Sequence, residues 1–170
     1  MSSLDQYPRS TLIKLVEMYA KNWLAHDGCW FLAAEETYGT ETAMELDGLA
    51  WKRFAVSEAK RIMKTFSIPR NGGLTALAEA FQYRLYAVLN AQRIEWKNGH
   101  TLIFKMQDCR VQKTRKAKNL ADFPCKSVGI IEFTEFARTV DHRIRTECIA
   151  CPPDKAEGFY CAWAFSLDLP

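Results

Sequence analysis

Several features are scarce in this 170-residue sequence, and each absence narrows the class of protein. The chain has no run of the roughly 18 to 20 uncharged apolar residues that a membrane-crossing helix needs. Even the apolar segment 30–34 is followed directly by Glu35 and Glu36. The first ten residues have neither the basic n-region nor the apolar h-region of a secretory signal. We therefore expect a soluble cytoplasmic protein with no membrane partner.

Internal repeats, low-complexity tracts and linkers are also absent from the sequence. With 48% hydrophobic and 25% charged residues, the composition is typical of one folded domain. We predict a single domain over 1–170, with a mainly helical half at 1–88 and a sheet half at 89–170. The net charge of +3 is mild, so no nucleic-acid partner is expected.

Apolar residues at helical spacing dominate the first half. Residues 11–23 predict an amphipathic helix, and residues 30–38 predict a short buried helix that ends at Gly39. The segment 40–66 should form the longest helix, because its pattern continues until a Pro and Gly-rich turn. A further helical pattern covers 74–85.

Extended patterns dominate the second half. Two runs between residues 92 and 108 flank Asn98-Gly99, a dipeptide that suits a two-residue hairpin turn. A helix is predicted over 128–140, and strands are predicted over 142–148 and 159–167. Helices followed by strands indicate an α+β fold, in which N-terminal helices pack on a C-terminal antiparallel sheet of about four strands.

Basic residues gather in one stretch, for which two interpretations are open. Arg110, Lys113, Arg115, Lys116 and Lys118 lie within nine residues that contain no acidic side chain. The stretch is either a solvated loop or a contact for an anion or an acidic partner. A second group could form a cationic rim or simply be exposed charge: Arg138, His142, Arg143 and Arg145.

Cysteines are concentrated in the second half, where five of the six lie after Asp108. In a reducing compartment they are free thiols or metal ligands rather than a disulfide framework. Cys148 and Cys151 form a C-x-x-C pair, whose spacing lets both sulfurs bind one tetrahedral ion at about 2.3 Å. Cys109 and Cys125 lie on connections that could approach the same end of the sheet.

These residues predict a site for a soft metal ion. Thiolate ligands suit zinc first and an iron–sulfur cluster second. The predicted ligands are Cys109, Cys125, Cys148 and Cys151, with Cys161 as a fifth candidate that its strand position also places in the core. A set of redox or reactive thiols and ordinary buried cysteines remain alternatives. Cys29 is predicted to have a packing role.

A second constellation lies between the first two predicted helices, where an imidazole neighbours carboxylates. His26, Asp27 and Glu35 could perform acid–base chemistry or bind a metal, or they could belong to a solvated turn at Asp27-Gly28. The residues expected to surround a small-molecule ligand are His26, Asp27, Glu35, Arg110, Arg138 and Arg145.

A resemblance to known proteins rests on four segments: HDGCWFLAAEETYG, DCRVQKTRKAK, FPCKSVGIIEFTEFARTVDHRIRTECIACPPD and YCAWAFSL. They resemble an uncharacterised bacterial family of small cytosolic proteins that is similar to the L-2-amino-thiazoline-4-carboxylic acid hydrolase-like proteins. More distantly, the chain resembles the 4-vinyl reductase domain, whose recurring cysteines are associated with metal or small-ligand binding. Cys125, Cys148 and Cys161 correspond to that pattern, whereas Cys109, Cys151 and Pro152-Pro153 depart from it.

Three functional hypotheses follow. The first is a metal-binding sensor or small-ligand-binding protein. The second, implied by the resemblance, is a cysteine- or metal-dependent hydrolase acting on a small amide or nitrogen heterocycle, although the sequence contains no Ser-His-Asp ordering that requires it. The third is an interaction module that forms a homodimer, because related helical modules tend to dimerise.

Overall fold

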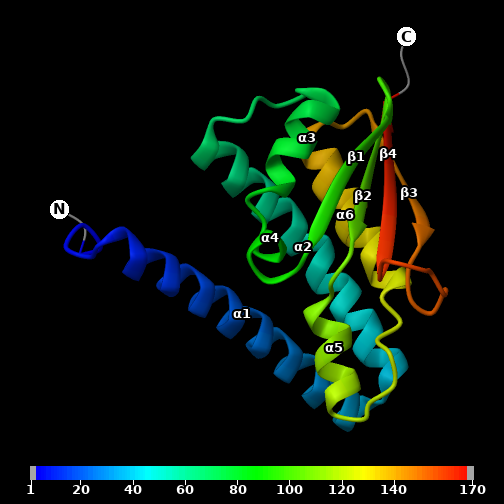
Figure 1. The fold of residues 1–170 in the computed structure, drawn as a ribbon. Helices are drawn as coiled ribbons and strands as arrows, with labels where there is room; N and C mark the ends of the chain where they lie inside the picture. The colour runs from blue at the N-terminus through cyan, green and yellow to red at the C-terminus, as the bar shows by residue number, and fades with distance from the viewer. Residues whose placement is uncertain (1–2, 168–170) are drawn as a thin grey trace.

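The computed structural model describes residues 3–167 and confirms an α+β fold (Figure 1). Four helices come first: α1 (Arg9–Tyr38), α2 (Thr40–Phe66), α3 (Gly73–Phe81) and α4 (Leu85–Leu89). A hairpin of β1 (Gln92–Asn98) and β2 (Thr101–Met106) leads to α5 (Arg110–Ala117) and α6 (Lys126–Val140). The chain then returns to the sheet as β3 (Ile144–Ala150) and β4 (Cys161–Leu167).

The four strands form one antiparallel sheet in the order β1-β2-β4-β3. The predicted hairpin is confirmed, but its two-residue turn is Gly99-His100, one residue later than predicted, because Asn98 belongs to β1 and pairs with Thr101. Period-two alternation also holds: Leu102, Phe104 and Met106 are buried on β2, and Trp163 and Phe165 are buried on β4. The two central strands therefore supply one wall of the core.

Aromatic side chains join the sheet to the helices. The Phe133 ring on α6 stacks on Trp163, with ring centroids 4.8 Å apart, and the Phe81 ring on α3 lies 5.0 Å from Phe104. Gly129 lets α6 approach the sheet closely, because a Cβ atom there would lie 2.7 Å from Cζ2 of Trp163. Helix α6 thus packs between α2 and the sheet.

Helix α1 differs from two of the predictions. It runs without interruption from Arg9 to Tyr38, so the turn expected at Asp27-Gly28 does not form. A glycine inside a helix costs about 1 kcal/mol relative to alanine, and without capping partners it does not end the helix. The helix instead ends at Gly39, whose φ of 84° suits glycine. At 30 residues, α1 is longer than α2 with 27, so the prediction that α2 is the longest helix was wrong.

The basic stretch is helix α5 rather than a loop, because Arg, Lys and Gln are strong helix formers. Two of its cations find acidic partners from outside the stretch: Lys113 lies 2.6 Å from Asp108, and Arg115 lies 3.6 Å from Glu35. The helix predicted over 74–85 is also divided, because the backbone between α3 and α4 is extended at Arg84.

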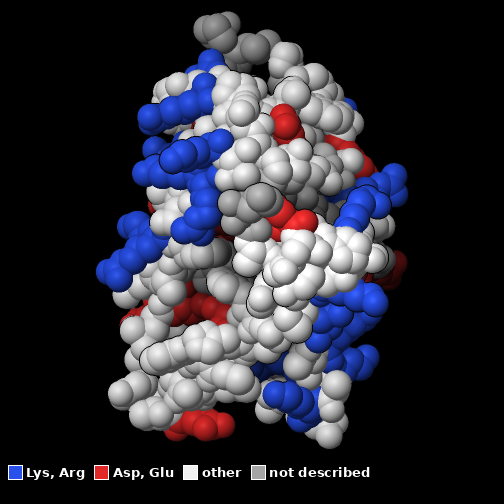
Figure 2. Space-filling model, turned by 90° about the vertical axis from the view of Figure 1, so that its left-hand side faces the viewer, with Lys and Arg blue, Asp and Glu red and all other residues white. Residues whose placement is uncertain are grey.

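The N-terminal half of α1 extends away from the body of the molecule (Figure 1). Ile13, Val16 and Tyr19 on this half are 44%, 55% and 61% exposed. From the side that faces the viewer in Figure 2, basic side chains gather at both margins, and uncharged residues with a few acidic ones lie between them. No helix within residues 3–167 has both the length and the apolar character needed to cross a membrane.

Two buried ionic clusters lie within the fold. Arg84, which is 2% exposed, donates from Nε to Glu58 at 3.0 Å and from Nη2 to Glu132 at 2.7 Å. Asp141, which is fully buried, accepts hydrogen bonds from the Gly73 backbone N–H at 3.0 Å and from Nη2 of Arg143 at 2.6 Å. Because these charges are paired, they tie helices and loops together rather than forming an open site.

Candidate functional site: a thiol-lined cavity

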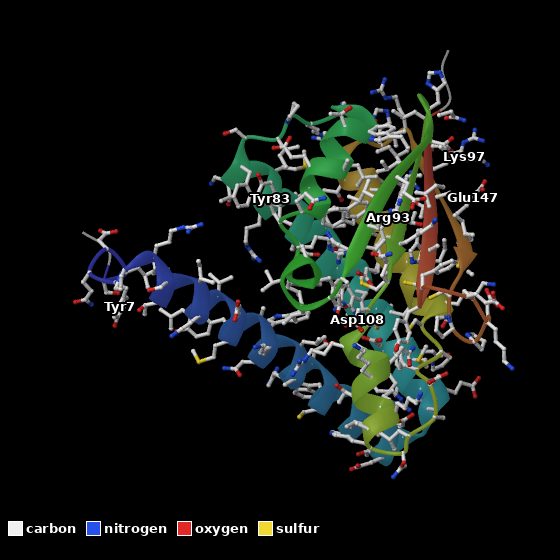
Figure 3. The ribbon with its side chains drawn as sticks, in the orientation of Figure 1. Tyr7, Tyr83, Arg93, Lys97, Asp108 and Glu147 are labelled. Atoms are coloured by element: carbon white, nitrogen blue, oxygen red, sulfur yellow. The ribbon has the colours of Figure 1, made fainter. Side chains whose placement is uncertain are left out.

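A cavity of about 320 Å³ lies between α1, α2 and one end of the sheet, with α5 and α6 completing its walls. Figure 3 places Asp108 at this end of β2, immediately before Cys109 in the chain. The cavity is of the size that a small organic molecule occupies, and its lining is mainly apolar with a few polar groups. It is therefore the candidate functional site.

Five cysteines line this cavity: Cys29 from α1 and, from four segments of the second half of the chain, Cys109, Cys125, Cys151 and Cys161. The antiparallel register explains why three of them meet. Met106 at the end of β2 pairs with Cys161 at the start of β4, and Ala150 at the end of β3 pairs with Ala162. Cys151 directly follows β3, and Cys109 follows β2 after two residues, so both lie at the same end of the sheet.

Cys125 reaches the cavity from the connection that precedes α6. The backbone N–H of the next residue, Lys126, donates to the Pro152 carbonyl at 3.0 Å. This hydrogen bond joins the segment that carries Cys125 to the segment that carries Cys151. The convergence of the cysteines is thus produced by backbone pairing.

The thiols interact with one another. The Cys151 thiol, in a residue only 1% exposed, is hydrogen-bonded to the thiols of Cys125 and Cys161. These two contacts, with burial, raise the pKa of Cys151 above its ordinary value. The hydrogen bond from Cys151 lowers the pKa of Cys161 against the opposing effect of burial. Cys161 is therefore the thiol of this pair that more readily becomes a thiolate.

At Cys109, burial is the largest effect on the pKa. It raises the pKa of the Cys109 thiol to about 12, and repulsion from Cys125 and Cys161 adds to the effect, whereas backbone N–H groups of α5 act against it. The side chain of Gln112, itself buried, donates from Nε2 to the Cys125 sulfur at 3.1 Å. One face of α5 therefore supports the sulfur cluster.

Cys148 does not line this cavity, although it forms the C-x-x-C pair with Cys151. It lines a shallow recess with Pro124, Lys126 and Pro153, outside the cavity that holds Cys151. Cys148 lies within β3 and Cys151 follows its last residue, and residues three apart on an extended chain face opposite sides. The structure thus brings Cys161 to the cavity in place of Cys148.

Carboxyl groups line the cavity away from the strand ends. Asp27 on α1, Asp47 on α2 and Glu132 on α6 all contribute to the wall. Burial raises the pKa of Asp47 to about 7, repulsion from Asp27 and Glu132 acts in the same direction, and a hydrogen bond with Trp51 opposes it. Burial also raises the pKa of Asp27, against the attraction of His26. At neutral pH Asp47 therefore exchanges its proton readily.

Aromatic rings complete the lining. Trp51 and Tyr86 stack with their centroids 6.2 Å apart, and both line the cavity. Trp163 is fully buried in the same wall, and its indole N–H has no hydrogen-bond partner of ordinary geometry among the described residues. It lies near enough to Cys161 to lower the pKa of that thiol.

Residues 5–167, almost the whole chain, match a family of unknown function, DUF6125. The chain belongs to this family. A search of curated proteins finds no match. Membership of DUF6125 carries no activity with it, so the resemblance to the hydrolase-like proteins and to the 4-vinyl reductase domain stays a prediction.

Other predicted site residues of this DUF6125 chain are dispersed. Asp27 and Arg110 line the cavity, whereas Glu35 lies outside it and is paired with Arg115. The remaining three, His26, Arg138 and Arg145, are exposed and do not line the cavity. Cys29, for which packing was predicted, is exposed on α1 and borders the cavity.

The described part of the DUF6125 chain contains no group of three or more His, Cys, Asp or Glu side chains already arranged to hold a metal ion. The four cavity cysteines nevertheless provide donors of the kind that zinc and iron–sulfur clusters use. The Cys151 thiol interacts with those of Cys125 and Cys161, and the pKa of Cys109 and of Cys151 is raised. Metal binding at this site would therefore require proton release and small side-chain rotations.

Several residues of the site are not predictable from the sequence: Asp47, Glu132 and Trp163 in the lining, and Gln112 beside Cys125. Asp47 and Glu132 lie on different helices, and no spacing rule relates them to Asp27. The prediction of β4 as a core strand did place Trp163 inside, but nothing in the alternation indicated an indole N–H without a partner.

Proposed function

We propose that this protein binds a small ligand in the cavity and holds a soft metal, zinc first and an iron–sulfur cluster second, on Cys109, Cys125, Cys151 and Cys161. The observation that carries the proposal is the convergence of four cysteines from four segments on one cavity wall. Four thiolates complete the coordination of a structural zinc ion or of a cluster. The metal would then anchor the end of the sheet beside the ligand.

The surroundings of the cysteines support this proposal. The N–H of Gln112, 3.1 Å from the Cys125 sulfur, and the indole N–H near Cys161 are donors of the kind that stabilise metal-bound thiolates. High pKa values at Cys109 and Cys151 are those of the metal-free thiols, and a bound cation lowers them. Metal affinity should therefore increase with pH.

Elemental analysis of protein purified without a metal-affinity resin tests the proposal. We expect about one zinc per chain, or several irons with matching sulfide for a cluster. The variants C151S and C161S should each lose most of this metal. Less than about a tenth of an equivalent of zinc plus iron in the unmodified protein would contradict the proposal.

Cys148 provides the matched control, because it lies three residues from Cys151 and in a separate recess. The variant C148S should keep the metal content of the unmodified protein. If C148S loses as much metal as C151S, the ligand set is the C-x-x-C pair predicted from sequence spacing, and the four-cysteine cavity site proposed above is wrong.

A cysteine-dependent hydrolase acting on a small amide or nitrogen heterocycle is the second candidate. It is favoured by the lowered pKa of Cys161 in a cavity that also contains Asp47, a carboxyl group able to transfer a proton near pH 7. In chelator-treated protein, iodoacetamide should then alkylate Cys161 faster than the exposed Cys29 at pH 7. Alkylation of Cys161 at or below the rate of Cys29 would exclude this function.

Homodimerisation and a cytoplasmic location are also part of the proposal. The exposed apolar residues Ile13, Val16 and Tyr19 on the extended half of α1 favour association, because exposed apolar surface is often an interface. Light scattering should give a mass near twice 19.5 kDa. A protein that remains monomeric at high concentration would contradict the proposed homodimer.

A further inference from the structure

Two of the cavity cysteines lie opposite each other at the end of the sheet. The pairing of β3 with β4 ends at Ala150 and Ala162. One further step along both chains brings Cys151 opposite Cys161. Opposite residues of an antiparallel pair have Cα atoms about 4.5 to 5.5 Å apart and side chains on the same face. A disulfide bond needs Cα atoms about 4.4 to 6.8 Å apart, so the strand register suits a bond between these two sulfurs.

The two side chains are also in contact and can be reached from the cavity. The Cys151 thiol interacts with the Cys161 thiol, and both residues line the cavity. Cys151 is only 1% exposed, whereas Cys161 is partly buried, so a small molecule in the cavity meets Cys161 first. The unpartnered indole N–H of Trp163 lies beside Cys161. A donor at this place stabilises negative charge on the sulfur.

The other sulfurs are less well placed for a bond to this pair. Cys125 also interacts with Cys151, but it lies on the connection before α6 rather than on the opposite strand. Its sulfur accepts a hydrogen bond from Nε2 of Gln112 at 3.1 Å and its thiol donates to the Phe123 carbonyl at 3.3 Å. Both bonds hold the Cys125 side chain where it is. Cys148 lines a separate recess.

We propose that Cys151 and Cys161 form a redox modification site, which hydrogen peroxide oxidises to an intramolecular disulfide bond. The Cys161 sulfur attacks one peroxide oxygen, the O–O bond breaks, and the departing hydroxide takes the thiol proton and becomes water. The Cys151 sulfur then attacks the resulting sulfenic acid and expels its hydroxyl group, which leaves as water with the Cys151 proton. The two thiols lose two electrons and two protons, and one peroxide is reduced to two waters.

The bond would also regulate the proposed metal site. Cys151 and Cys161 are two of its four proposed ligands, and a sulfur in a disulfide bond no longer binds a metal as a thiolate. Oxidation should therefore release the metal. This consequence rests on the proposed function, whereas the disulfide bond itself rests only on the strand register and the contact between the thiols.

Peptide mapping of the protein as purified tests the modification. The protein is treated with up to about ten equivalents of hydrogen peroxide, its remaining thiols are blocked with iodoacetamide, and it is digested with trypsin. The peptides 146–155, 156–170 and 119–126 carry Cys151, Cys161 and Cys125 respectively. We expect the link between 146–155 and 156–170 to be about tenfold more abundant than any other cysteine link. In urea-unfolded protein this preference should disappear.

Three variants identify the sulfurs. Cys148 shares its tryptic peptide with Cys151, so C148S is the matched control and should keep the link. C151S and C161S should each abolish it. In C151S the sulfenic acid on Cys161 persists, and dimedone should label Cys161 several-fold more than in the unmodified protein.

A link that survives in C151S, a predominant link between Cys125 and Cys151, or no link in the folded protein would overturn the inference. Metal content, measured before and after oxidation, separates it from the proposed function. Metal-free protein that forms the bond supports the inference and contradicts the metal site. Protein that keeps its metal and forms no bond overturns the inference alone. If the bond forms and the metal stays bound, the modification is supported and the proposed ligand set is wrong.

Discussion

The interior of this protein contains two kinds of polar residue, and they differ in how completely they are paired. Around Arg84 and Asp141, buried charges lie within 3.0 Å of opposite charges or backbone donors, and only Nη1 of Arg84 lacks a partner among the described atoms. In the cavity, by contrast, Asp47 has like charges as neighbours and the Trp163 N–H has no partner. Paired groups stabilise the fold, and groups left unpaired are available to a ligand.

The largest effect is expected when the paired cluster is broken. The variant R84M leaves Glu58 and Glu132 buried without a cation, and this should lower the free energy of unfolding by about 3 to 5 kcal/mol. Urea denaturation measures the loss. The matched control R93M removes an arginine from an exposed ion pair with Glu95 and should change little.

Neutralising Glu58 and Glu132 as well separates the electrostatic contribution of this cluster from its packing contribution. The triple variant R84M/E58Q/E132Q should recover part of the stability that R84M loses, because no unpaired carboxylate remains. If the triple variant is no more stable than R84M, the contribution of Arg84 is mainly packing against aromatic rings, including those of Tyr86 and Phe136.

A smaller loss is expected at Asp141. Hydrogen bonds from Arg143, together with backbone N–H groups, lower the pKa of this carboxyl to about 2. Its stabilising effect is therefore complete above about pH 4 and disappears as the pH falls toward 2. D141N should be less stable than the unmodified protein by about 2 kcal/mol at pH 7, and the two should converge near pH 2. A difference that does not depend on pH would contradict this account.

The smallest effect should have the opposite sign and lie in the cavity. The raised pKa of Asp47 means that the folded protein loses stability as the pH increases from about 4 to 7, where the buried carboxyl ionises. D47N should therefore be more stable at pH 8, by about 1 to 2 kcal/mol after allowance for screening by water in the cavity. Thermal melts at pH 4 and pH 8 measure this, with E45Q, at an exposed acid on the same helix, as the control for D47N. A destabilised D47N at pH 8 would remove the distinction between the two kinds of polar residue.

Local patterns predicted much of the fold. The hairpin of β1 and β2, the helix before Val140 and the alternation in β4 are each determined within about ten residues, and all three are present, although the hairpin turn is Gly99-His100 rather than Asn98-Gly99. The interruption expected at Gly28 was wrong, because one glycine does not end a helix, and the rings of Trp23 on α1 and Phe54 on α2 stack near this point. The loop expected at the basic stretch was wrong because cationic residues with high helix propensity form α5.

The site was harder to predict, because it depends on contacts between distant segments. Sequence spacing predicted Cys148 as the partner of Cys151, but the two cysteines line different pockets, because residues three apart on an extended chain face opposite sides. Cys161 was predicted to be a core residue and a reserve ligand, and pairing with Met106 brings it to the cavity. Asp47 lies near Asp27 only because α1 and α2 fold back on each other at Gly39. No local sequence pattern predicts this contact.

The close approach of Gly129 to Trp163 has a consequence for the cavity itself. A single methyl group on α6 would collide with the indole ring, so the ring would have to move or α6 would have to shift outward. Because Trp163 also forms part of the cavity wall, the position of one backbone atom on α6 governs the shape of the space available to a guest molecule. The contact between the Gly129 backbone and the Trp163 ring therefore fixes this wall of the cavity. The wall has little freedom to move, and the dimensions of the cavity can change little on this side.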